Sequence, residues 1–599
     1  MPLLIYGARI DNEDEQLTID NFTSLVDAQS WEEFMPRGVT KATFNKFKRY
    51  YDPDIFAAAG KRICAMARAA DRLTIEERIE RITDIFSTFR NPDKETVLTP
   101  WRVVNMHMSD TLGGYTFFNE DFSETIAEPR YVEHHKVTDE VFAPGSHLLE
   151  INSKSGLYPL YLAYNLYRRA CKDAMFSPQT LDEHLAIWDK AVADSIFVIC
   201  KTPMAKAITR RTLMGFRRGT VNMWAPEDLI NKIKNQPELF IKKVHDLVGK
   251  DVKINAIVGN PPYQEIDGGG TGDSAKPIYN TFVDIAKQLE PGYLSMIMPS
   301  RWLKGGKGLV SFRESMMADE RIAFLCDYAD ARICFPSIHI DGGVCYFRWD
   351  ATLSGTSQNV EYIYHALNGE VIKSFRQLKN KDSKTVIRDP RQQSIIEKVS
   401  KVNFKPFSLI VSSRNPFGFN ADLFNNPERY PDITLREFPQ LDCCRVYGVK
   451  GIKGGAKRIQ AYIQSQNINK SLDSIDKYKI FFSKAYMTTS TVPPALIMGN
   501  PGDICTETFL KIGDFTDEIT MLNCCTFIYS KFCRALLFYN RSSLNISQET
   551  FDLIPLQDFS IESDINWSQS VADIDRQLYT KYNLTEDEIA FIESMIKPM

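Results

Sequence analysis

The chain has no run of about 18 apolar residues, so no membrane-spanning helix is expected. Its first residues lack a basic segment followed by an apolar core, which argues against a secretory signal peptide. None of the 12 cysteines forms a Cys-x-x-Cys pair, and no zinc or other metal site is indicated. These absences favour reduced thiols in a cytoplasmic protein.

The sequence also lacks a strong excess of either charge. It has 72 lysines and arginines against 76 acidic residues, a net charge of −4. Composition alone therefore does not indicate a nucleic-acid partner, although a contact face can be basic in an acidic protein. With 599 residues, the chain is long enough for about three or four domains.

Signatures of nucleotide hydrolysis and of DNA cleavage are missing as well. The glycine-rich stretch 305–308 contains Lys307 but not the Gly-Lys-Ser/Thr ending of a phosphate-binding loop. A Pro-Asp followed at a suitable distance by Glu-x-Lys, the pattern of many nucleases, is not convincingly present. If the protein works with a nuclease or a helicase, that activity is expected on another polypeptide or on a missing domain.

What the sequence does contain is a short apolar run, 254–258, that predicts a buried strand. It stops at Asn260-Pro261-Pro262-Tyr263, because two successive prolines fix φ and carry no N–H group. Open α/β sheets bind ligands at such carboxyl ends of strands. The Asn260 carboxamide and a nearby main-chain carbonyl can accept hydrogen bonds from an amino group. The Tyr263 ring offers a face for a planar base, although a proline turn without chemistry is the alternative.

This stretch resembles the Asn-Pro-Pro-Tyr motif of methyltransferases that use S-adenosylmethionine to methylate the exocyclic amine of adenine in DNA. The resemblance implies an α/β fold, with a Rossmann-like methyltransferase sheet and catalytic residues Asn260, Pro261, Pro262 and Tyr263. Asn260 and the Pro261 carbonyl would hold the amine, and Tyr263 would stack on the flipped adenine. Phe335 would form the second wall of the adenine pocket, with a plain core phenylalanine as the alternative.

Two upstream stretches resemble the cofactor motifs of the same family. Thr99-Pro100 is similar to the turn that contacts the methionine end of the cofactor. The stretch 146–158 reads as strand, tight loop and helix, and Glu150 and Gly156 match the acidic residue and the final glycine of the cofactor loop. Lys154 departs from the pattern, since the family has a glycine there, which lets the backbone approach the cofactor.

Two further positions concern the adenosine end of the cofactor. Cys200 stands at the end of the next predicted strand, where the family has an acid that holds the ribose hydroxyls, so that role is not carried over. Asp228 resembles the acid of the loop that meets the cofactor's adenine, and an N-capping role is its alternative.

The C-terminal part resembles target-recognition domains of restriction–modification proteins, mainly in its alternation of strand-like runs, glycine turns and basic residues. The candidate DNA-binding residues are Lys307, Lys450, Lys453, Lys457 and Arg458. The stretch 553–559 resembles a strand ending of such domains, and the tail predicts a pair of helices.

The predicted organisation is an N-terminal helical support region (1–95), a methyltransferase domain (96–350), an α+β target-recognition domain (351–570) and a helical tail (571–599). In the first region, Thr74 with Glu77 has the form of a capping box. Later segments predict a helix at 278–289 and a strand at 292–299, and the strand series includes 334–336.

The expected partner is duplex DNA, and the expected role is that of the modification component of a restriction–modification or related phage-defence system. Two alternatives stay open at this point. One is a methyltransferase for RNA or for a protein amide, since the same motif suits those amines. The other, suggested by Lys154 and Cys200, is a DNA-binding subunit whose cofactor site has decayed.

Overall fold

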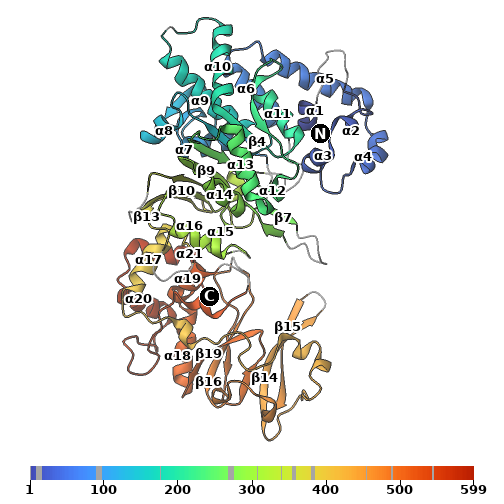
Figure 1. Cartoon of the computed structure of the whole chain (residues 1–599). Coiled ribbons are helices and arrows are strands. Elements are labelled where there is room, and N and C mark those ends of the chain that lie inside the picture. Colours follow the sequence, from blue (N-terminus) through green and yellow to red (C-terminus); the bar gives the residue numbers. More distant parts are fainter. Residues whose placement is uncertain are drawn as a thin grey trace. The chain divides into compact units, whose positions relative to one another are not determined.

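A central β-sheet organises the first part of the computed structural model, which divides into two units, Met1–Val386 and Ile387–Met599 (Figure 1). The structure describes residues 2–8, 17–89, 98–175, 177–266, 275–305, 308–336, 338, 340–353, 359–379, 385–452, 455–487, 490–541 and 545–599. Two candidate DNA-binding residues, Lys307 and Lys453, lie outside these ranges.

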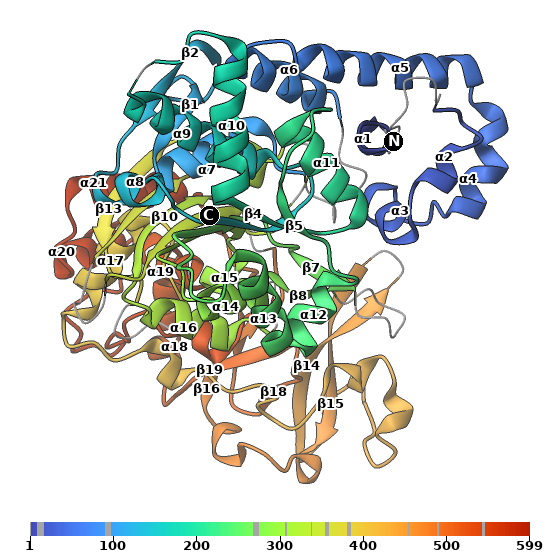
Figure 2. The same cartoon turned by 45° about the horizontal axis from the view of Figure 1, so that its top comes forward.

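In its described residues, the first unit begins with a series of α-helices. They are α1 (Pro2–Gly7), α2 (Phe22–Leu25), α3 (Ala28–Phe34), α4 (Lys41–Phe47), α5 (Pro53–Ala70) and α6 (Ile75–Ser87). The predicted capping box begins α6, because the Thr74 hydroxyl accepts the Glu77 N–H and the Glu77 carboxylate accepts the Thr74 N–H. Helix α1 packs against α5 and against α11 of the following segment (Figure 2), so the N-terminal helices share one core with the sheet.

The following segment carries the strands of the sheet and the helices between them. Its helices are α7 (Trp101–Thr111), α8 (Lys136–Val141), α9 (Leu157–Asp173), α10 (Leu181–Ser195), α11 (Pro203–Met214), α12 (Leu229–Asn235), α13 (Pro237–Val248), α14 (Tyr279–Gln288), α15 (Arg301–Lys304) and α16 (Val310–Ala318). The sheet strands are β3 (Leu148–Ser153), β4 (Ile196–Cys200), β5 (Asn222–Trp224), β6 (Ala256–Gly259), β9 (Tyr293–Pro299), β10 (Ile322–Tyr328), β11 (Val344–Asp350), β12 (Val360–His365) and β13 (Val371–Arg376). Two short hairpins complete it, β1 (Gly114–Phe118) with β2 (Thr125–Val132) and β7 (Gln264–Ile266) with β8 (Ala275–Pro277).

The strand order of the described sheet is β13-β12-β10-β11-β9-β6-β3-β4-β5. From β5 to β9 the strands are parallel, whereas β11 runs antiparallel between β9 and β10. The chain moves outward from β3 through β4 to β5, then returns to β6 on the other side of β3. Strands β3 and β6 therefore flank the topological switch point, where open α/β sheets bind ligands.

Apolar side chains of successive strand residues point to opposite faces of the sheet, and each face has its own core. Helices α7, α9, α10 and α11 pack on the face that carries Val198 and Val258. Helices α12, α13, α14 and α16 pack on the face that carries Ile199 and Ile257 (Figure 1). The predicted α/β architecture is confirmed, and the predicted helix at 278–289 and strand at 292–299 correspond to α14 and β9.

Three features of this architecture differ from the expectations. The predicted domain boundary at 350 lies inside the first unit, because β12 and β13 extend the central sheet beyond β10. The segment 334–336 is not a strand; it follows a 3₁₀ turn (Ala331–Ile333), and the Phe335 N–H donates to the Ala331 carbonyl. The stretch 553–559 has no strand of its own, only a single bridge from Pro555 to Pro406.

The second unit combines two small sheets with helices, so it is α+β. Its helices are α17 (Pro390–Ser400), α18 (Glu518–Tyr529), α19 (Lys531–Asn540), α20 (Val571–Lys581) and α21 (Glu586–Met595). Its strands are β14 (Cys443–Ile452), β15 (Gly455–Gln464), β16 (Tyr478–Ser483), β17 (Ile497–Gly499), β18 (Asp503–Cys505) and β19 (Phe509–Phe515). Helices α20 and α21 form the predicted pair and belong to the same core as α18 and α19.

Candidate active site

The proline corner after β6 lies at the switch point of the sheet. Gly259 ends the strand, and a Cβ at this position would lie 2.5 Å from the Ile151 carbonyl oxygen. Glycine therefore allows β6 to approach β3 closely at the point where the chain turns. Beyond it, Pro261 and Pro262 are buried and supply no N–H to the sheet.

Asn260 is 8% exposed and held from two sides. Its side-chain amide nitrogen donates a 2.9 Å hydrogen bond to the Thr99 hydroxyl, and its main-chain carbonyl accepts a 2.7 Å bond from the Asn152 side chain. Its carboxamide oxygen is buried and has no hydrogen-bond partner among the described residues. Thr99 thus orients the amide so that an acceptor is left for an incoming N–H group.

Two more buried acceptors lie along the end of β3. The Asn152 carboxamide oxygen and one Glu150 carboxylate oxygen also lack a partner in the described part of the chain. Asn152 has φ of 77° at a shift in the β3–β4 register, a conformation that asparagine tolerates better than most residues. Burial raises the pKa of Glu150 to about 8, with Ser153 opposing the shift, so the carboxyl group is mostly neutral at pH 7.

Tyr263 lies half-buried beside the core of the first unit. Its hydroxyl is buried with no partner among the residues that the structure describes, and burial raises its pKa well above the ordinary value. Cys334 also contributes to that shift, so the Phe335 segment lies near the Tyr263 ring. Phe335 itself is 1% exposed and belongs to the core, as its alternative interpretation has it, and its stacking role stays a prediction.

His107 of α7, which no sequence motif marks, links α7 to α9 and to β9. His107 accepts or donates at both ring nitrogens, 2.8 Å from the Tyr158 hydroxyl and 2.7 Å from the Ser295 hydroxyl. Burial lowers the pKa of His107 to about 3, so the ring is neutral and holds Tyr158 in place rather than carrying charge. No local pattern marks His107, because its partners are 51 and 188 residues away.

The loop between β3 and α9 has the expected glycine and an unexpected ion pair. Gly156 has φ of 77° at the start of α9, and a Cβ there would lie 2.9 Å from the Thr209 Cα, so glycine fits for both reasons. The Lys154 ammonium lies 2.7 Å from the Glu33 carboxylate of α3. No local pattern links Lys154 to Glu33, because 121 positions separate them in the chain.

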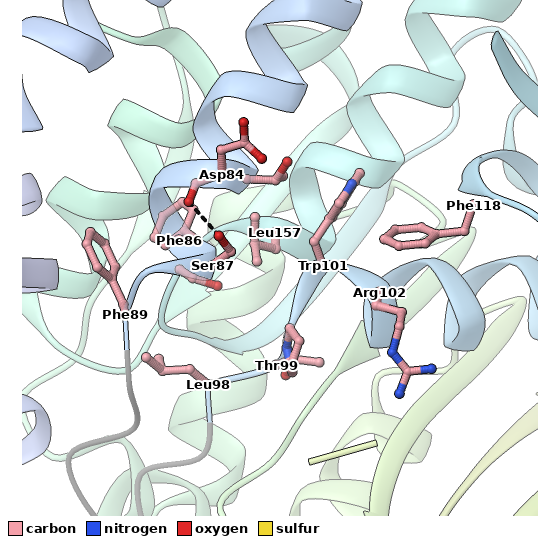
Figure 3. A pocket seen from close by; sticks show the side chains of 13 residues that line it. Asp84, Phe86, Ser87, Phe89, Leu98, Thr99, Trp101, Arg102, Phe118 and Leu157 are labelled. Atoms are coloured by element: carbon pink, nitrogen blue, oxygen red, sulfur yellow. Dashed lines mark hydrogen bonds between the residues drawn. The ribbon is translucent and has the colours of Figure 1, made fainter. Parts of the chain in front are cut away.

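Two pockets flank this loop. The first has a volume of about 350 Å³ and is lined by Thr99, Pro100, Ser155 and Leu157, together with one side of α6. Figure 3 shows Phe86 and Ser87 of α6 with Leu157, and Leu98 and Thr99 on the segment that leads into α7. The second, of about 620 Å³, is lined by Lys154, Lys201, Ile230 and Pro262 and by residues of the stretch 28–41. Both volumes fall in the range of small-molecule sites.

Two positions remain: Asp228, the candidate for the adenosine end of the cofactor, and Cys200, to which no cofactor role is assigned. Asp228 is the N-cap of α12, where its carboxylate accepts the Asn231 N–H at 3.1 Å. This confirms its alternative role, although Ile230, two residues later, lines the larger pocket. Cys200 ends β4 fully buried, and burial raises its thiol pKa, so it supplies neither an anion nor a nucleophile.

Part of the chain that contains this site is similar in sequence to known proteins. Residues 194–335, which include the whole proline corner, match the family model described as Eco57I restriction-modification methylase. The matched residues are about a quarter of the chain. An uncharacterized adenine-specific methylase of Mycoplasma pneumoniae (strain ATCC 29342 / M129 / Subtype 1) is 31% identical over 173 residues, which cover 28% of this chain and 41% of the relative. The chain therefore matches about two fifths of the length of that relative.

Some solved structures resemble parts of this chain at low identity. The type IIL restriction-modification enzyme MmeI in complex with DNA has a TM-score of 0.40 at 10% identity, covering 76% of this chain and 73% of its own. A nuclease-deletion mutant of the type ISP enzyme LlaGI has a TM-score of 0.43 at 9% identity, covering 85% and 58%. These similarities are too low to assign an activity.

Outside residues 194–335, the described basic candidates lie on the β14–β15 hairpin of the second unit. Lys450 and Lys457 are exposed and directly opposite each other across the two strands. Arg458 is the next residue, so it points to the other face of the hairpin, where its guanidinium lies 5.9 Å from the Phe509 ring centre. It lines a cavity of about 830 Å³ within this unit, together with Arg414 and Lys484.

Among the described helices, none has the length and apolar composition that crossing a membrane requires. This finding concerns only the described ranges of the chain. Likewise, no group of three or more histidine, cysteine or acidic side chains in those ranges could hold a metal ion.

Proposed function

We propose that this chain is an adenine-specific DNA methyltransferase. It transfers a methyl group from S-adenosylmethionine to the exocyclic amine of an adenine flipped out of duplex DNA, as the modification component of a restriction–modification system. The Asn260 amide carries this proposal, because Thr99 fixes its nitrogen and leaves its buried oxygen without a partner. This acceptor lies in the segment that matches the methylase family.

The residues around the switch point fit the proposed cofactor. S-adenosylmethionine carries an ammonium group and ribose hydroxyls, and the unpaired oxygens of Glu150 and Asn152 are the acceptors that such donors need. The pockets on either side of the loop would hold its methionine end near Thr99 and Pro100 and its adenosine end near Lys201. When bound, this cofactor supplies an electrophilic methyl group.

The protein's own contribution is to hold the amine and exclude water. The Asn260 oxygen and the Pro261 carbonyl each accept one N–H of the target amine, which keeps the nitrogen lone pair directed at the methyl carbon. Tyr263, and Phe335 if its ring becomes accessible, stack on the extruded base. The bound cofactor would supply the methyl carbon and leave with a neutral sulfur that keeps the electron pair, and the amine held by Asn260 and Pro261 would lose one proton to bulk solvent once the site opens.

The second unit would contact the DNA, through Lys450 and Lys457 and through the cavity that Arg458 lines. Lys307 and Lys453 belong to the same proposal. Base-specific reading would come from other side chains, since phosphate contacts carry no sequence information. A separate nuclease or helicase subunit would supply cleavage, and the site of action would be the cytoplasm.

Transfer of labelled methyl groups tests the proposal directly. The purified full-length chain is incubated with radiolabelled S-adenosylmethionine and duplex DNA, and the DNA is digested to nucleosides. Label in N6-methyladenine is expected with the wild type and absent with Asn260→Ala, while DNA binding and thermal stability persist. Label in RNA, in protein or in cytosine would overturn the adenine assignment, and full activity of Asn260→Ala would overturn the role of the corner.

A further inference from the structure

A lysine occupies a position of the cofactor loop where the methylase family has a glycine, and this lysine is not free. Lys154 is 9% exposed at its side chain, and its ammonium lies 2.7 Å from the carboxylate of Glu33, which is 15% exposed. Glu33 lies on α3 (Ala28–Phe34), 121 positions earlier in the chain. An ion pair with this little exposure is screened by water much less than one at the surface.

Helix α3 is fixed on the catalytic segment by further contacts beside this pair. The Gln29 side chain donates a 3.1 Å hydrogen bond to the Lys201 carbonyl, and the Met204 N–H donates a 3.0 Å bond to the Ser30 hydroxyl. The Asp27 carboxylate caps the helix by accepting the Ser30 N–H. These contacts hold the Glu33 carboxylate against the loop in a defined place.

The same carboxylate faces a second cation. Burial lowers the pKa of Lys201, Lys154 lowers it further, and Glu33 opposes both effects together with Asp228. Lys154, Lys201 and Glu33 line the pocket of about 620 Å³ that also contains Pro262 of the proline corner. A sulfonium ligand entering this pocket meets three ammonium groups, those of Lys41, Lys154 and Lys201, and the guanidinium of Arg37. The carboxylates that line the pocket and offset their repulsion are Glu32, Glu33 and Glu265.

We propose that Glu33 is a positioning residue of the S-adenosylmethionine site: it neutralises Lys154, so that the cofactor loop accepts a cationic ligand although it carries a lysine. Helix α3 is then one wall of that site rather than only a support for the sheet. This inference rests on the proposed function. It also accounts for the departure at Lys154 without a decayed site, because the extra positive charge has its own partner.

Titration calorimetry, which measures the affinity of the full-length chain for two ligands, tests this role of Glu33. S-adenosylmethionine carries a sulfonium, whereas S-adenosylhomocysteine has the same adenosine and amino-acid parts with a neutral sulfur. Charge compensation predicts that Glu33→Gln weakens S-adenosylmethionine about tenfold more than S-adenosylhomocysteine. A purely structural role of Glu33 predicts equal losses for the two ligands, and that result would overturn the inference.

Three variants make the test specific. Adding Lys154→Gln to Glu33→Gln removes both charges and should restore the wild-type ratio of the two affinities. Lys154→Gln alone should shift that ratio toward S-adenosylmethionine, which keeps the test valid if Glu33→Gln does not fold. Asp20→Asn is the matched control, since it breaks a 2.7 Å ion pair with Lys48 in the same helical region and outside the pocket.

The outcomes separate this inference from the proposed function. If the wild type binds neither ligand, the proposed cofactor fails, and the role of Glu33 fails with it. If the wild type binds both ligands and the ratio stays constant in every variant, the role of Glu33 is refuted while the methyltransferase assignment stands.

Discussion

The Thr99 hydroxyl accepts a 2.9 Å hydrogen bond from the side-chain amide of Asn260, although 161 residues separate them in the chain. The contact joins the turn before α7 to the proline corner after β6. Because a carboxamide has a donor end and an acceptor end, fixing the nitrogen also fixes where the oxygen points. A residue predicted to contact the cofactor thereby also orients the predicted catalytic amide.

Replacing Thr99 by valine should impair methyl transfer without abolishing binding. Valine has a similar shape but no oxygen, so the buried amide nitrogen of Asn260 loses its acceptor at about 1–3 kcal/mol. We expect kcat to fall roughly 10- to 100-fold, since each 1.4 kcal/mol of lost transition-state stabilisation is a factor of ten. Thr99→Ser keeps the hydroxyl and should remain within a few-fold of the wild type. Equal kcat values for the valine and serine variants would show that the amide needs no such orientation.

Tyr263 should act through its ring and not through its hydroxyl. The hydroxyl has no partner among the described residues, so Tyr263→Phe should keep kcat/KM within about threefold. Tyr263→Ala removes the stacking face, which is worth about 1–3 kcal/mol per base, and should lower kcat/KM roughly 10- to 100-fold. Fluorescence of 2-aminopurine at the target position measures base extrusion in the same variants. Comparable losses in the phenylalanine and alanine variants would assign the function to the hydroxyl.

The parts that the sequence predicted well are those set by local patterns. Thr74 and Glu77 lie three residues apart, and their capping box is present at the start of α6. The periodic apolar residues of α14 and the continuous apolar run of β9 were read correctly for the same reason. The chain's turn at Asn260 follows from two prolines, which act on the backbone wherever they stand.

The parts that were missed depend on residues far apart in the chain. No pattern links Glu33 to Lys154, or His107 to Ser295, because the topology of the sheet brings them together. The sequence predicts 334–336 as part of the strand series, but this segment makes a local turn, in which a Phe-Pro pair fits as well as at a strand end. The first unit extends beyond 350 because β12 pairs with β10. The sequence of β12 predicts a strand but does not show with which strand it pairs.

The buried carboxyl group of Glu150 should make the stability of the protein depend on pH. Burial raises its pKa to about 8 from an ordinary value of 4.5, so folding favours the neutral form. This contribution is complete below pH 4.5 and is lost as the pH rises through about 8, with a slope of up to ~1.4 kcal/mol per pH unit.

Glu150→Gln keeps the shape of the side chain and cannot ionise. We therefore expect its melting temperature, relative to the wild type, to rise between pH 5 and about 8 and to level off above that. Scanning calorimetry across this range without ligand measures the difference. A constant difference at all pH values would mean that Glu150 does not change its protonation state there. Glu183→Gln is a control, because that exposed carboxylate caps α10 and its pKa is lowered instead.

Lys450 and Lys457 should contribute to DNA affinity by contacting phosphates. They are exposed and directly opposite each other on β14 and β15, an arrangement of like charges that is unfavourable unless an anion lies nearby. Each phosphate contact contributes about 0.9 to the slope of log affinity against log salt. Lys450→Gln and Lys457→Gln should each lower that slope by about this amount, and the double variant by about twice as much, for any duplex sequence.

Lys401 is an exposed lysine after α17, and Lys401→Gln should leave the slope unchanged. Fluorescence anisotropy with labelled duplexes at several salt concentrations gives the slopes, and wild-type slopes in the double variant would place the DNA on another face of this unit.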